Sequence, residues 1–270
     1  MFITLTTDFG HQDAFVGIMK GVIAGIDPAA KVIDLTHSIP PQDILAGALT
    51  LRHSVPYFPR GTIHVVVVDP GVGGKRRPIL VESGGNYFIG PDNGVLSLAV
   101  SRESEHRFTL LSNPAYHLRP ASATFHGRDI FAPTAAYLSR GVPPESFGER
   151  IDNIVQIEIP KVERQGRRLL GRIIYIDRFG NLFTNVERRD LTGVAEGQIE
   201  IRIGERAGRI VGLQPNYAAV PPGHLAALWN SWDLLEIASN LDSAQKITDA
   251  SVGDQIEVVF LPGSAGGEKR

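Results

Sequence analysis

The stretch His64–Arg77, with the sequence HVVVVDPGVGGKRR, indicates both the fold class and the place of a site. Its run Val65–Val68 is continuous and β-branched, which is typical of a central strand buried on both faces. Asp69 ends this strand, and a glycine-rich loop then brings back Arg76 and Arg77. Open α/β sheets bind ligands at the carboxyl ends of their strands. The stretch therefore predicts an acid and a guanidinium at one sheet edge, although a plain turn with solvated basic residues would give the same pattern.

Composition narrows the class of protein. The chain has 270 residues, a hydrophobic content of 43% and a net charge of -2, which together favour a globular protein with a small-molecule partner over one that binds nucleic acid. No apolar run approaches the ~20 residues of a membrane span. The beginning of the sequence has no secretory pattern, so we expect a cytoplasmic protein that does not bind a membrane. The absence of cysteine excludes disulfides and thiolate chemistry.

Strand and helix patterns alternate through the first part of the chain. They predict an N-terminal α/β domain over residues 1–150 with a mostly parallel central sheet. The predicted strands are Phe2–Thr7, Lys31–Leu35, Val65–Val68 and a hairpin of Ile79–Glu82 with Tyr87–Ile89. The predicted helices are Asp13–Ile26, Pro41–Ser54, a short one at Val95–Val100, and one that contains Ile130, Phe131, Ala136 and Tyr137.

Two carboxylates flank the loop after the first strand. Asp8 follows Phe2–Thr7 directly, and a carboxylate at this edge suits the two hydroxyls of a ribose. Asp13 is a second candidate, but it could equally cap the following helix. His11 and Asp13 together resemble a pair of metal ligands only faintly, so we predict no metal site.

His126 lies just before the last predicted helix of the first domain, in the string Thr124-Phe125-His126-Gly127-Arg128-Asp129. The positive end of a helix dipole disfavours an imidazolium there. A neutral histidine can handle protons, but a histidine in this position is often only structural.

The second half of the chain has a different pattern. Composition rich in Pro, Glu, Arg and Gly predicts a linker at 151–168, and residues 263–270 are expected to be a disordered tail. Between them, over 169–262, short strands separated by turns predict a smaller all-β barrel domain. Those strands are Leu169–Ile176, Gln198–Ile203, His224–Asn230, Leu234–Ala238 and Gln255–Leu261. Two polar and aromatic loops, 177–181 and 229–232, suit a nucleoside, but they could equally be ordinary turns.

Six motifs give the chain a family resemblance. In order, they are TLTTDFG, VVVVDPGVGGKRR, GPDNG, TFHGRDIFAP, IDRFGNLFTN and WNSWDLLEIA. Over about residues 2–262 the chain resembles the S-adenosyl-L-methionine hydroxide adenosyltransferases, which hydrolyse S-adenosyl-L-methionine and are similar to fluorinases and chlorinases. The resemblance implies an N-terminal α/β domain, a C-terminal β-barrel, and a homotrimer with active sites at subunit interfaces.

The resemblance also assigns roles to residues. Asp69, Arg76 and His126 match the catalytic set that handles water, with Arg77 as a possible substitute for Arg76, and Asp8 matches the ribose carboxylate. The remaining substrate-binding matches are Asp13, Asp177, Phe179, Asn181, Tyr217, Asn230, Ser231 and Glu236, of which Asp13 and Tyr217 match less securely. No cofactor is implied beyond the substrate itself.

The expected reaction is attack of activated water at C5′ of S-adenosyl-L-methionine, which yields adenosine and methionine. The halogenases lack an acid at the position of Asp69, and Gly127 replaces a serine that helps to hold fluoride in the fluorinase. Both differences disfavour halide chemistry. A halogenase and a nucleoside-binding protein without turnover are the alternatives.

Overall fold

The computed structural model describes residues 1–100, 105–204 and 209–262. The chain divides into two compact units, Met1–Ile157 and Glu158–Arg270, and each is considered by itself. The tail predicted to be disordered, 263–270, lies outside the described residues.

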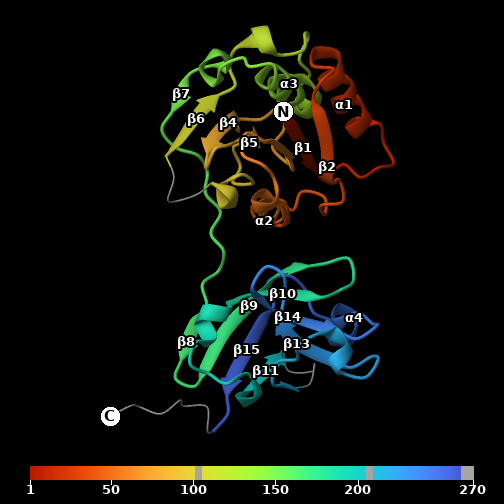
Figure 1. The fold of residues 1–270 in the computed structure, drawn as a ribbon, viewed down its shortest axis with the longest axis vertical. Coiled ribbons are helices and arrows are strands. Elements are labelled where there is room, and N and C mark those ends of the chain that lie inside the picture. Colours follow the sequence, from red (N-terminus) through yellow and green to blue (C-terminus); the bar gives the residue numbers. More distant parts are fainter. Residues whose placement is uncertain (101–104, 205–208, 263–270) are drawn as a thin grey trace. The chain divides into compact units, whose positions relative to one another are not determined.

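The described part of the first unit contains one sheet of seven strands in the order β2-β1-β3-β5-β4-β6-β7 (Figure 1). β2, β1, β3 and β5 pair parallel with one another, but β4 pairs antiparallel with β5 and β6, and β6 pairs antiparallel with β7. The prediction of a mostly parallel sheet is therefore wrong in its second half. The strands are Phe2–Thr7, Lys31–Thr36, Ile63–Val67, Pro78–Ser83, Asn86–Pro91, His106–Leu110 and Arg150–Ile151 for β1 to β7.

A two-residue turn explains the change of direction. Ser83 pairs with Asn86, so only Gly84 and Gly85 connect β4 to β5, with φ angles of 59° and 80°. Two consecutive positive φ angles are the signature of a tight hairpin turn, and glycine adopts them without strain. The predicted hairpin is confirmed, and it carries the antiparallel half of the sheet with it.

Helices cover both faces of this sheet. α1 (Phe15–Ile26) and α3 (Ala132–Ser139) pack together on one face, where Met19 and Phe131 join a core with Val65 and Val67. α2 (Ile44–Ser54) lies on the other face, where a side chain at Gly47 would come within 3.1 Å of Val68. The prediction that the Val65–Val68 run is buried on both faces is thus confirmed.

Three predicted helices are shorter than their patterns indicate, and the first of them, α1, begins at Phe15 instead of Asp13. α2 begins at Ile44 instead of Pro41, because Gln42 has a φ of 67° and the Asp43 side chain caps the helix by accepting from the Ala46 amide. The short helix predicted at Val95–Val100 is only a 3₁₀ turn, Ser97–Ala99.

The described residues of the second unit form an antiparallel, barrel-like sheet in the order β12-β11-β15-β9-β10-β14-β13, with β8 paired to β9. The Gln214 amide donates to the Ala227 carbonyl at 2.7 Å and so links the ends of this order. A short helix, α4, spans Ala244–Thr248. The strands are Glu163–Gln165, Arg168–Ile176, Leu182–Glu187, Ile199–Ile203, Arg209–Val211, Leu225–Trp229, Leu234–Ser239 and Gln255–Phe260 for β8 to β15.

The central strand β10 is missing from the sequence-based prediction, because buried polar residues interrupt its hydrophobic pattern. Thr184 is fully buried and donates to the Leu235 carbonyl at 2.8 Å. The buried Asn185 side chain accepts from the Arg172 amide at 2.7 Å. Both side chains replace water with backbone partners, as burial requires.

The segment predicted as a linker, 151–168, carries strand at both ends. Ile151 belongs to β7, and Glu163–Gln165 forms β8. The domain boundaries at 150 and 169 stay predictions.

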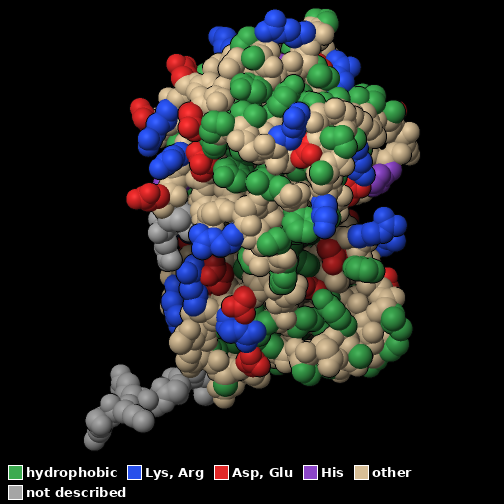
Figure 2. Space-filling model, turned by 45° about the horizontal axis from the view of Figure 1, so that its top comes forward, with side chains coloured by type: hydrophobic (Ala, Val, Ile, Leu, Met, Phe, Trp, Pro, Cys, Tyr) green, Lys and Arg blue, Asp and Glu red, His purple; other side chains and the backbone are tan. Residues whose placement is uncertain are grey.

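Acidic and basic side chains are interspersed on the face that Figure 2 shows. This pattern agrees with the small net charge of -2. In the part of the chain that the structure describes, no helix is long and apolar enough to cross a membrane.

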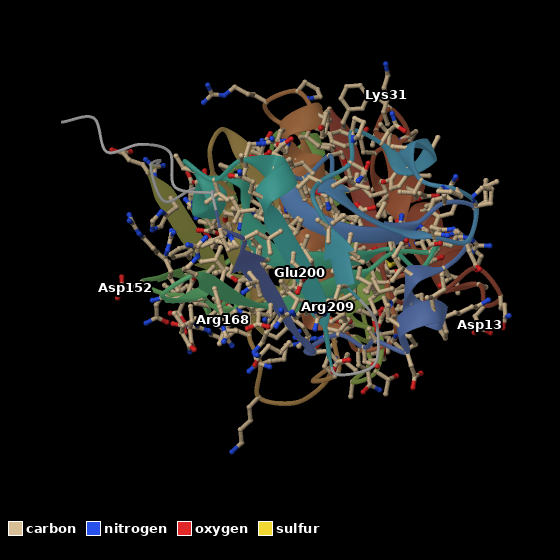
Figure 3. The ribbon with its side chains drawn as sticks, turned by 90° about the horizontal axis from the view of Figure 1, so that it is seen from below. Asp13, Lys31, Asp152, Arg168, Glu200 and Arg209 are labelled. Carbon is tan, nitrogen blue, oxygen red and sulfur yellow. The ribbon has the colours of Figure 1, made fainter. Side chains whose placement is uncertain are left out.

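A row of ion pairs spans four strands of the second unit, and three of its members, Arg168, Glu200 and Arg209, are labelled in Figure 3. Arg168 pairs with Glu257, Glu257 with Arg202, Arg202 with Glu200, and Glu200 with Arg209. Arg202 and Glu200 both lie in β11, and the other three pairs cross between strands and help to fix their register.

Candidate active site

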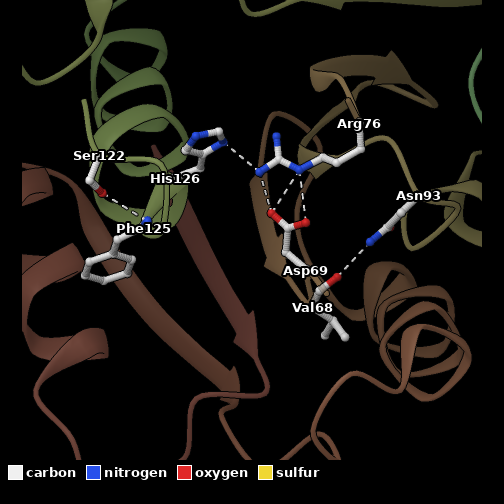
Figure 4. Close-up of polar contacts among 7 residues, drawn as sticks. All are labelled: Val68, Asp69, Arg76, Asn93, Ser122, Phe125 and His126. Atoms are coloured by element: carbon white, nitrogen blue, oxygen red, sulfur yellow. Dashed lines mark hydrogen bonds and ion pairs between the residues drawn. The ribbon is translucent and has the colours of Figure 1, made fainter. Parts of the chain in front are cut away.

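The site begins where β3 ends, with an aspartate and an arginine held side by side (Figure 4). Arg76 Nε donates to both carboxylate oxygens of Asp69, each at 3.0 Å, and Nη2 also donates to Oδ2. Only 5% of the Asp69 side chain and 9% of the Arg76 side chain are exposed. Charge-assisted bonds of this kind fix both the position and the orientation of the two groups.

His126 completes the group, because its Nδ1 lies 2.7 Å from Arg76 Nη2. A guanidinium has only donors, so Nδ1 accepts, and the remaining proton of the neutral ring sits on Nε2. Burial lowers the pKa of His126, the positive charge of Arg76 lowers it further, and Asp69 and Asp129 act in the opposite direction. The expectation of a neutral imidazole agrees with this geometry.

The helix after His126 begins with a π-helical turn, Gly127–Phe131, that continues into α3. The loop before His126 is fixed by Asp129, which is 1% exposed and accepts from the Ser122 amide at 2.8 Å. Ser122 Oγ in turn accepts from the Phe125 amide at 3.1 Å. Irregular helical turns of this kind recur at functional sites.

Gly73 brings the two halves of the site together. It has a φ of 73°, and a side chain there would lie 2.1 Å from the carbonyl oxygen of Ala123. The loop that carries Arg76 can therefore approach the segment that carries His126 only with glycine at this position.

One donor of Arg76 stays unused. Nη1 is buried and has no hydrogen-bond partner among the described residues, while the guanidinium carbon lies 5.6 Å from the centre of the Phe131 ring. A buried charged donor without a partner is costly. The arrangement therefore suits a polar ligand or developing negative charge beside Arg76.

Arg77 has different partners from Arg76. Its Nε donates to Asp92 at 2.7 Å, and its Nη2 donates to the Asn153 carbonyl at 2.9 Å. The predicted substitution of Arg77 for Arg76 finds no support in this geometry, since Arg77 is bound to Asp92 and Asn153.

Asp8 lies at the same sheet edge as Asp69. β1 and β3 are parallel neighbours in which Thr7 pairs with Val67, and each carboxylate follows its strand. The Asp8 carboxylate accepts from the Gln42 amide at 2.8 Å. Asp13 is exposed (Figure 3), and it does not cap α1, whose N-cap is Ala14 without a side-chain bond.

Two of the residues expected to bind substrate in the second unit, Tyr217 and the buried Glu236, are hydrogen-bonded to each other. Tyr217 donates to Glu236 Oε1 at 2.9 Å, and Glu236 is 1% exposed. Burial raises the pKa of the Glu236 carboxyl, hydrogen bonding by Tyr217 and Asn230 opposes this, and the charge of Asp177 adds to the rise. Burial and the same carboxylates raise the pKa of Tyr217 to about 12.

Asp177 also organises its own loop. Its Oδ1 accepts from the amides of Phe179 and Asn181, each at 2.9 Å, and its Oδ2 accepts from the Asn181 side chain at 3.1 Å. This loop leaves Phe179 76% exposed, which suits a ring that stacks on a ligand.

The second loop turns on Asn230, whose side-chain oxygen accepts from the amides of Trp232 and Leu234 at 2.9 and 3.1 Å. Ser231, which lies between Asn230 and Trp232, is exposed. The asparagine thus shapes the turn that presents the serine.

Two supporting residues were missed from the sequence. Asn93 donates to the Val68 carbonyl at 2.9 Å and so fixes the backbone that carries Asp69 (Figure 4). Asp129 fixes the loop of His126. The strings GPDNG and FHGRD contain these residues, but the partner of Asn93 lies 25 residues away, and that of Asp129 is a backbone amide, which a sequence pattern does not reveal.

Among the described residues, no group of three or more His, Cys, Asp or Glu side chains is placed to hold a metal ion. His11 instead packs edge-on against His37, with ring centres 5.2 Å apart.

The fold and this site define an α/β unit with a charged set at its sheet edge, followed by a barrel-like β unit. Family models for the SAM hydroxide adenosyltransferase N-terminal and C-terminal domains match residues 3–148 and 171–257. The chain therefore belongs to the SAM hydroxide adenosyltransferase family.

Individual relatives support the same family. A protein from Thermus thermophilus named (R)-S-adenosyl-L-methionine hydrolase is 35% identical, with 94% of this chain and 97% of the relative covered. A fluorinase from Nocardia brasiliensis is 26% identical over 95% of this chain and 96% of its own length. A solved structure of a conserved protein from Thermotoga maritima has a TM-score of 0.86 and 32% identity, and the match covers 96% of this chain and 100% of that one.

Proposed function

We propose that this protein hydrolyses S-adenosyl-L-methionine to adenosine and L-methionine, with Asp69, Arg76 and His126 as the residues that activate water. The observation that carries the proposal is the buried Arg76 Nη1, a charged donor left without a partner beside Asp69. Relatives that match nearly the whole chain and are named (R)-S-adenosyl-L-methionine hydrolase support it.

The chemistry requires a nucleophile more than an acid. The oxygen of water bonds to C5′, and the C5′–S bond breaks with its electron pair passing to sulfur. Methionine leaves as a neutral thioether and needs no proton. Asp69 accepts the proton of the attacking water, and Arg76 stabilises the negative charge that develops on its oxygen. His126, which accepts from Arg76, fixes the guanidinium in place.

Substrate binding follows from the same assignment. Asp8 accepts hydrogen bonds from the ribose hydroxyls, since a carboxylate is an acceptor only. The other proposed contacts come from Asp13 and from the second unit, namely Asp177, Phe179, Asn181, Tyr217, Asn230, Ser231 and Glu236. The exposed position of Asp13 makes it the weakest member of this set.

The test is to incubate the purified protein with each sulfonium diastereomer of S-adenosyl-L-methionine, with and without chloride, and to separate the products. Adenosine in both conditions supports hydrolysis. 5′-Chloro-5′-deoxyadenosine as the sole product would make the protein a halogenase, and tight binding without any product would make it a nucleoside-binding protein.

We also propose that no metal or cofactor takes part, and that the protein is a cytoplasmic homotrimer whose sites are shared between subunits. The family resemblance supports the trimer. Activity that survives exhaustive chelation supports the first point, and activity lost on chelation and restored by one divalent metal would overturn it.

Sharing can be tested by refolding two inactive variants together, Asp69→Ala in the first unit and Ser231→Tyr in the second. In a cyclic trimer with shared sites, about a quarter of all sites regain two intact faces. Mixed trimers without any regained activity would contradict the proposal.

A further inference from the structure

A buried histidine outside the catalytic set lies behind the loop that carries Asp8. His37 follows β2 and is 1% exposed. Its Nδ1 lies 2.9 Å from Thr7 Oγ1, and Thr7, the last residue of β1, is fully buried. The catalytic mechanism uses neither side chain.

The protonation of the His37 ring sets the direction of its hydrogen bond with Thr7. Asp34 Oδ1 lies 3.0 Å from His37 Nε2, although off the line of its N–H bond, and this carboxylate favours a proton on Nε2. Burial lowers the pKa of His37, and the charge of Lys20 adds to this, while the Asp34 carboxylate raises the pKa without reversing the net shift, so the ring is neutral and Nδ1 is an acceptor. The Thr7 hydroxyl therefore donates to His37.

The same hydroxyl reaches the loop of Asp8. Thr7 Oγ1 accepts from the Phe9 amide at 3.2 Å, and the His37 carbonyl accepts from the Gly10 amide at 2.7 Å. These two bonds fix the backbone immediately after Asp8. On its other side, the Asp8 carboxylate is fixed by the Gln42 amide at 2.8 Å.

Asp34, which contacts His37, is itself held by a lysine at the surface. Asp34 Oδ2 accepts from Lys20 Nζ at 2.6 Å, which ties β2 to α1. Asp34 thus contacts His37 with one oxygen and Lys20 with the other.

We propose that Thr7 and His37 are positioning residues for substrate binding: the chain Asp34–His37–Thr7 fixes the Phe9 amide and holds the Asp8 carboxylate where the ribose hydroxyls bind. This inference rests on the proposed function, because it takes Asp8 as the ribose acceptor. Neither side chain touches substrate, so their effect is on binding.

The chain offers a matched control for a test. Thr6 is also fully buried in β1, but its hydroxyl has no hydrogen-bond partner among the described residues. Thr7→Val and Thr6→Val therefore make the same isosteric change, and only the first removes a bond to the Asp8 loop. Thr7→Ser keeps the hydroxyl and serves as the rescue variant.

For each variant, kcat and KM are measured for S-adenosyl-L-methionine, and the Kd of adenosine is measured by calorimetry. Thr7→Val is expected to raise KM and Kd about tenfold and to change kcat by less than about twofold, since one hydrogen bond that orients the binding loop is lost. Thr6→Val and Thr7→Ser are expected to stay within about twofold of the wild type.

His37 gives a second, independent comparison. In His37→Asn, the amide oxygen can replace Nδ1 as acceptor from Thr7, whereas in His37→Gln the amide reaches toward Asp34 instead. The Asn variant should therefore bind adenosine more tightly than the Gln variant. Circular dichroism melts identify any variant that fails to fold, and the Thr7 series then carries the test.

Equal effects of Thr7→Val and Thr6→Val, or a loss of kcat with unchanged Kd, would overturn the positioning role. Failure of the proposed function looks different, because the wild-type protein would then form no adenosine. Adenosine affinity would still report on the Asp8 loop in that case.

Discussion

Two aspartate–arginine pairs come from adjacent arginines, yet they serve different ends. Arg76 pairs with Asp69, and Arg77 pairs with Asp92. Both carboxylates are buried, with side-chain exposures of 5% and 2%. Arg77 Nη2 donates to both the backbone and the side chain of Asn153, while the buried Nη1 of Arg76 has no hydrogen-bond partner in the described structure.

The partners of the second carboxylate oxygen make the same distinction. Asp92 Oδ1 accepts from the Val155 amide at 2.7 Å, so the Asp92–Arg77 pair fastens residues 153–155 to the sheet. The Asp69–Arg76 pair instead faces His126, a group that can change protonation. We therefore infer that a buried ion pair indicates a catalytic site where one of its donors has no partner and a titratable side chain lies next to it.

The largest expected effect separates the two aspartates. Asp69→Asn should lower kcat by roughly 10²–10⁴, because one proton-accepting group is lost. Asp92→Asn should leave kcat near the wild-type value. Steady-state kinetics on both variants checks this, and an Asp69→Asn enzyme with normal turnover would remove Asp69 from the mechanism.

The arginines give the next contrast. Arg76→Lys should reduce kcat by about 10², since an ammonium cannot keep the bidentate contact with Asp69 and still serve the developing charge. Arg77→Lys should lower the thermal midpoint and leave kcat unchanged. Equal kinetic losses in the two variants would show that the adjacent pairs have no separate roles.

A third contrast compares Asp8, which shares the sheet edge with Asp69, with the exposed Asp13. Asp8→Ala should weaken adenosine binding by about 1–3 kcal/mol, because the ribose loses a charged acceptor. Asp13→Ala should have little effect. Calorimetry measures both, and an unaltered Kd in Asp8→Ala would return Asp8 to a structural role.

The smallest effect is on pH dependence. Burial and Arg76 lower the pKa of His126, so the ring becomes protonated, and stops accepting from Arg76, only below the usual histidine range near 6.5. The acidic limb of the kcat profile should therefore lie below about pH 6.5, also in Arg77→Lys. A limb above that pH in the wild type would contradict a neutral, buried His126.

Much of the first unit could be predicted, because its strands and helices have clear periodicity. Phe2–Thr7 is predicted with its observed bounds, and the continuous apolar strand before Asp69 predicts an acid and a guanidinium at that sheet edge, whereas His126 joins them only through the family resemblance. The hairpin of β4 and β5 was also predicted, but β6 and β7, which extend the antiparallel half of the sheet, were not among the predicted strands.

The sequence could not separate Arg76 from Arg77, since their partners Asp69 and Asp92 both follow apolar strands. Buried polar positions were the other gap. Thr184 and Asn185 form part of the buried β10 through backbone partners that lie far away in sequence.

The central claim is that Asp69, Arg76 and His126 direct water to C5′ of the substrate. Turnover in ¹⁸O-labelled water, with chloride present, tests it most directly. Mass spectrometry should find one ¹⁸O atom in the 5′-hydroxyl of adenosine and none in methionine, and Asp69→Asn should slow the appearance of that product. Unlabelled adenosine, a label in the amino-acid product, or 5′-chloro-5′-deoxyadenosine in place of adenosine would contradict it.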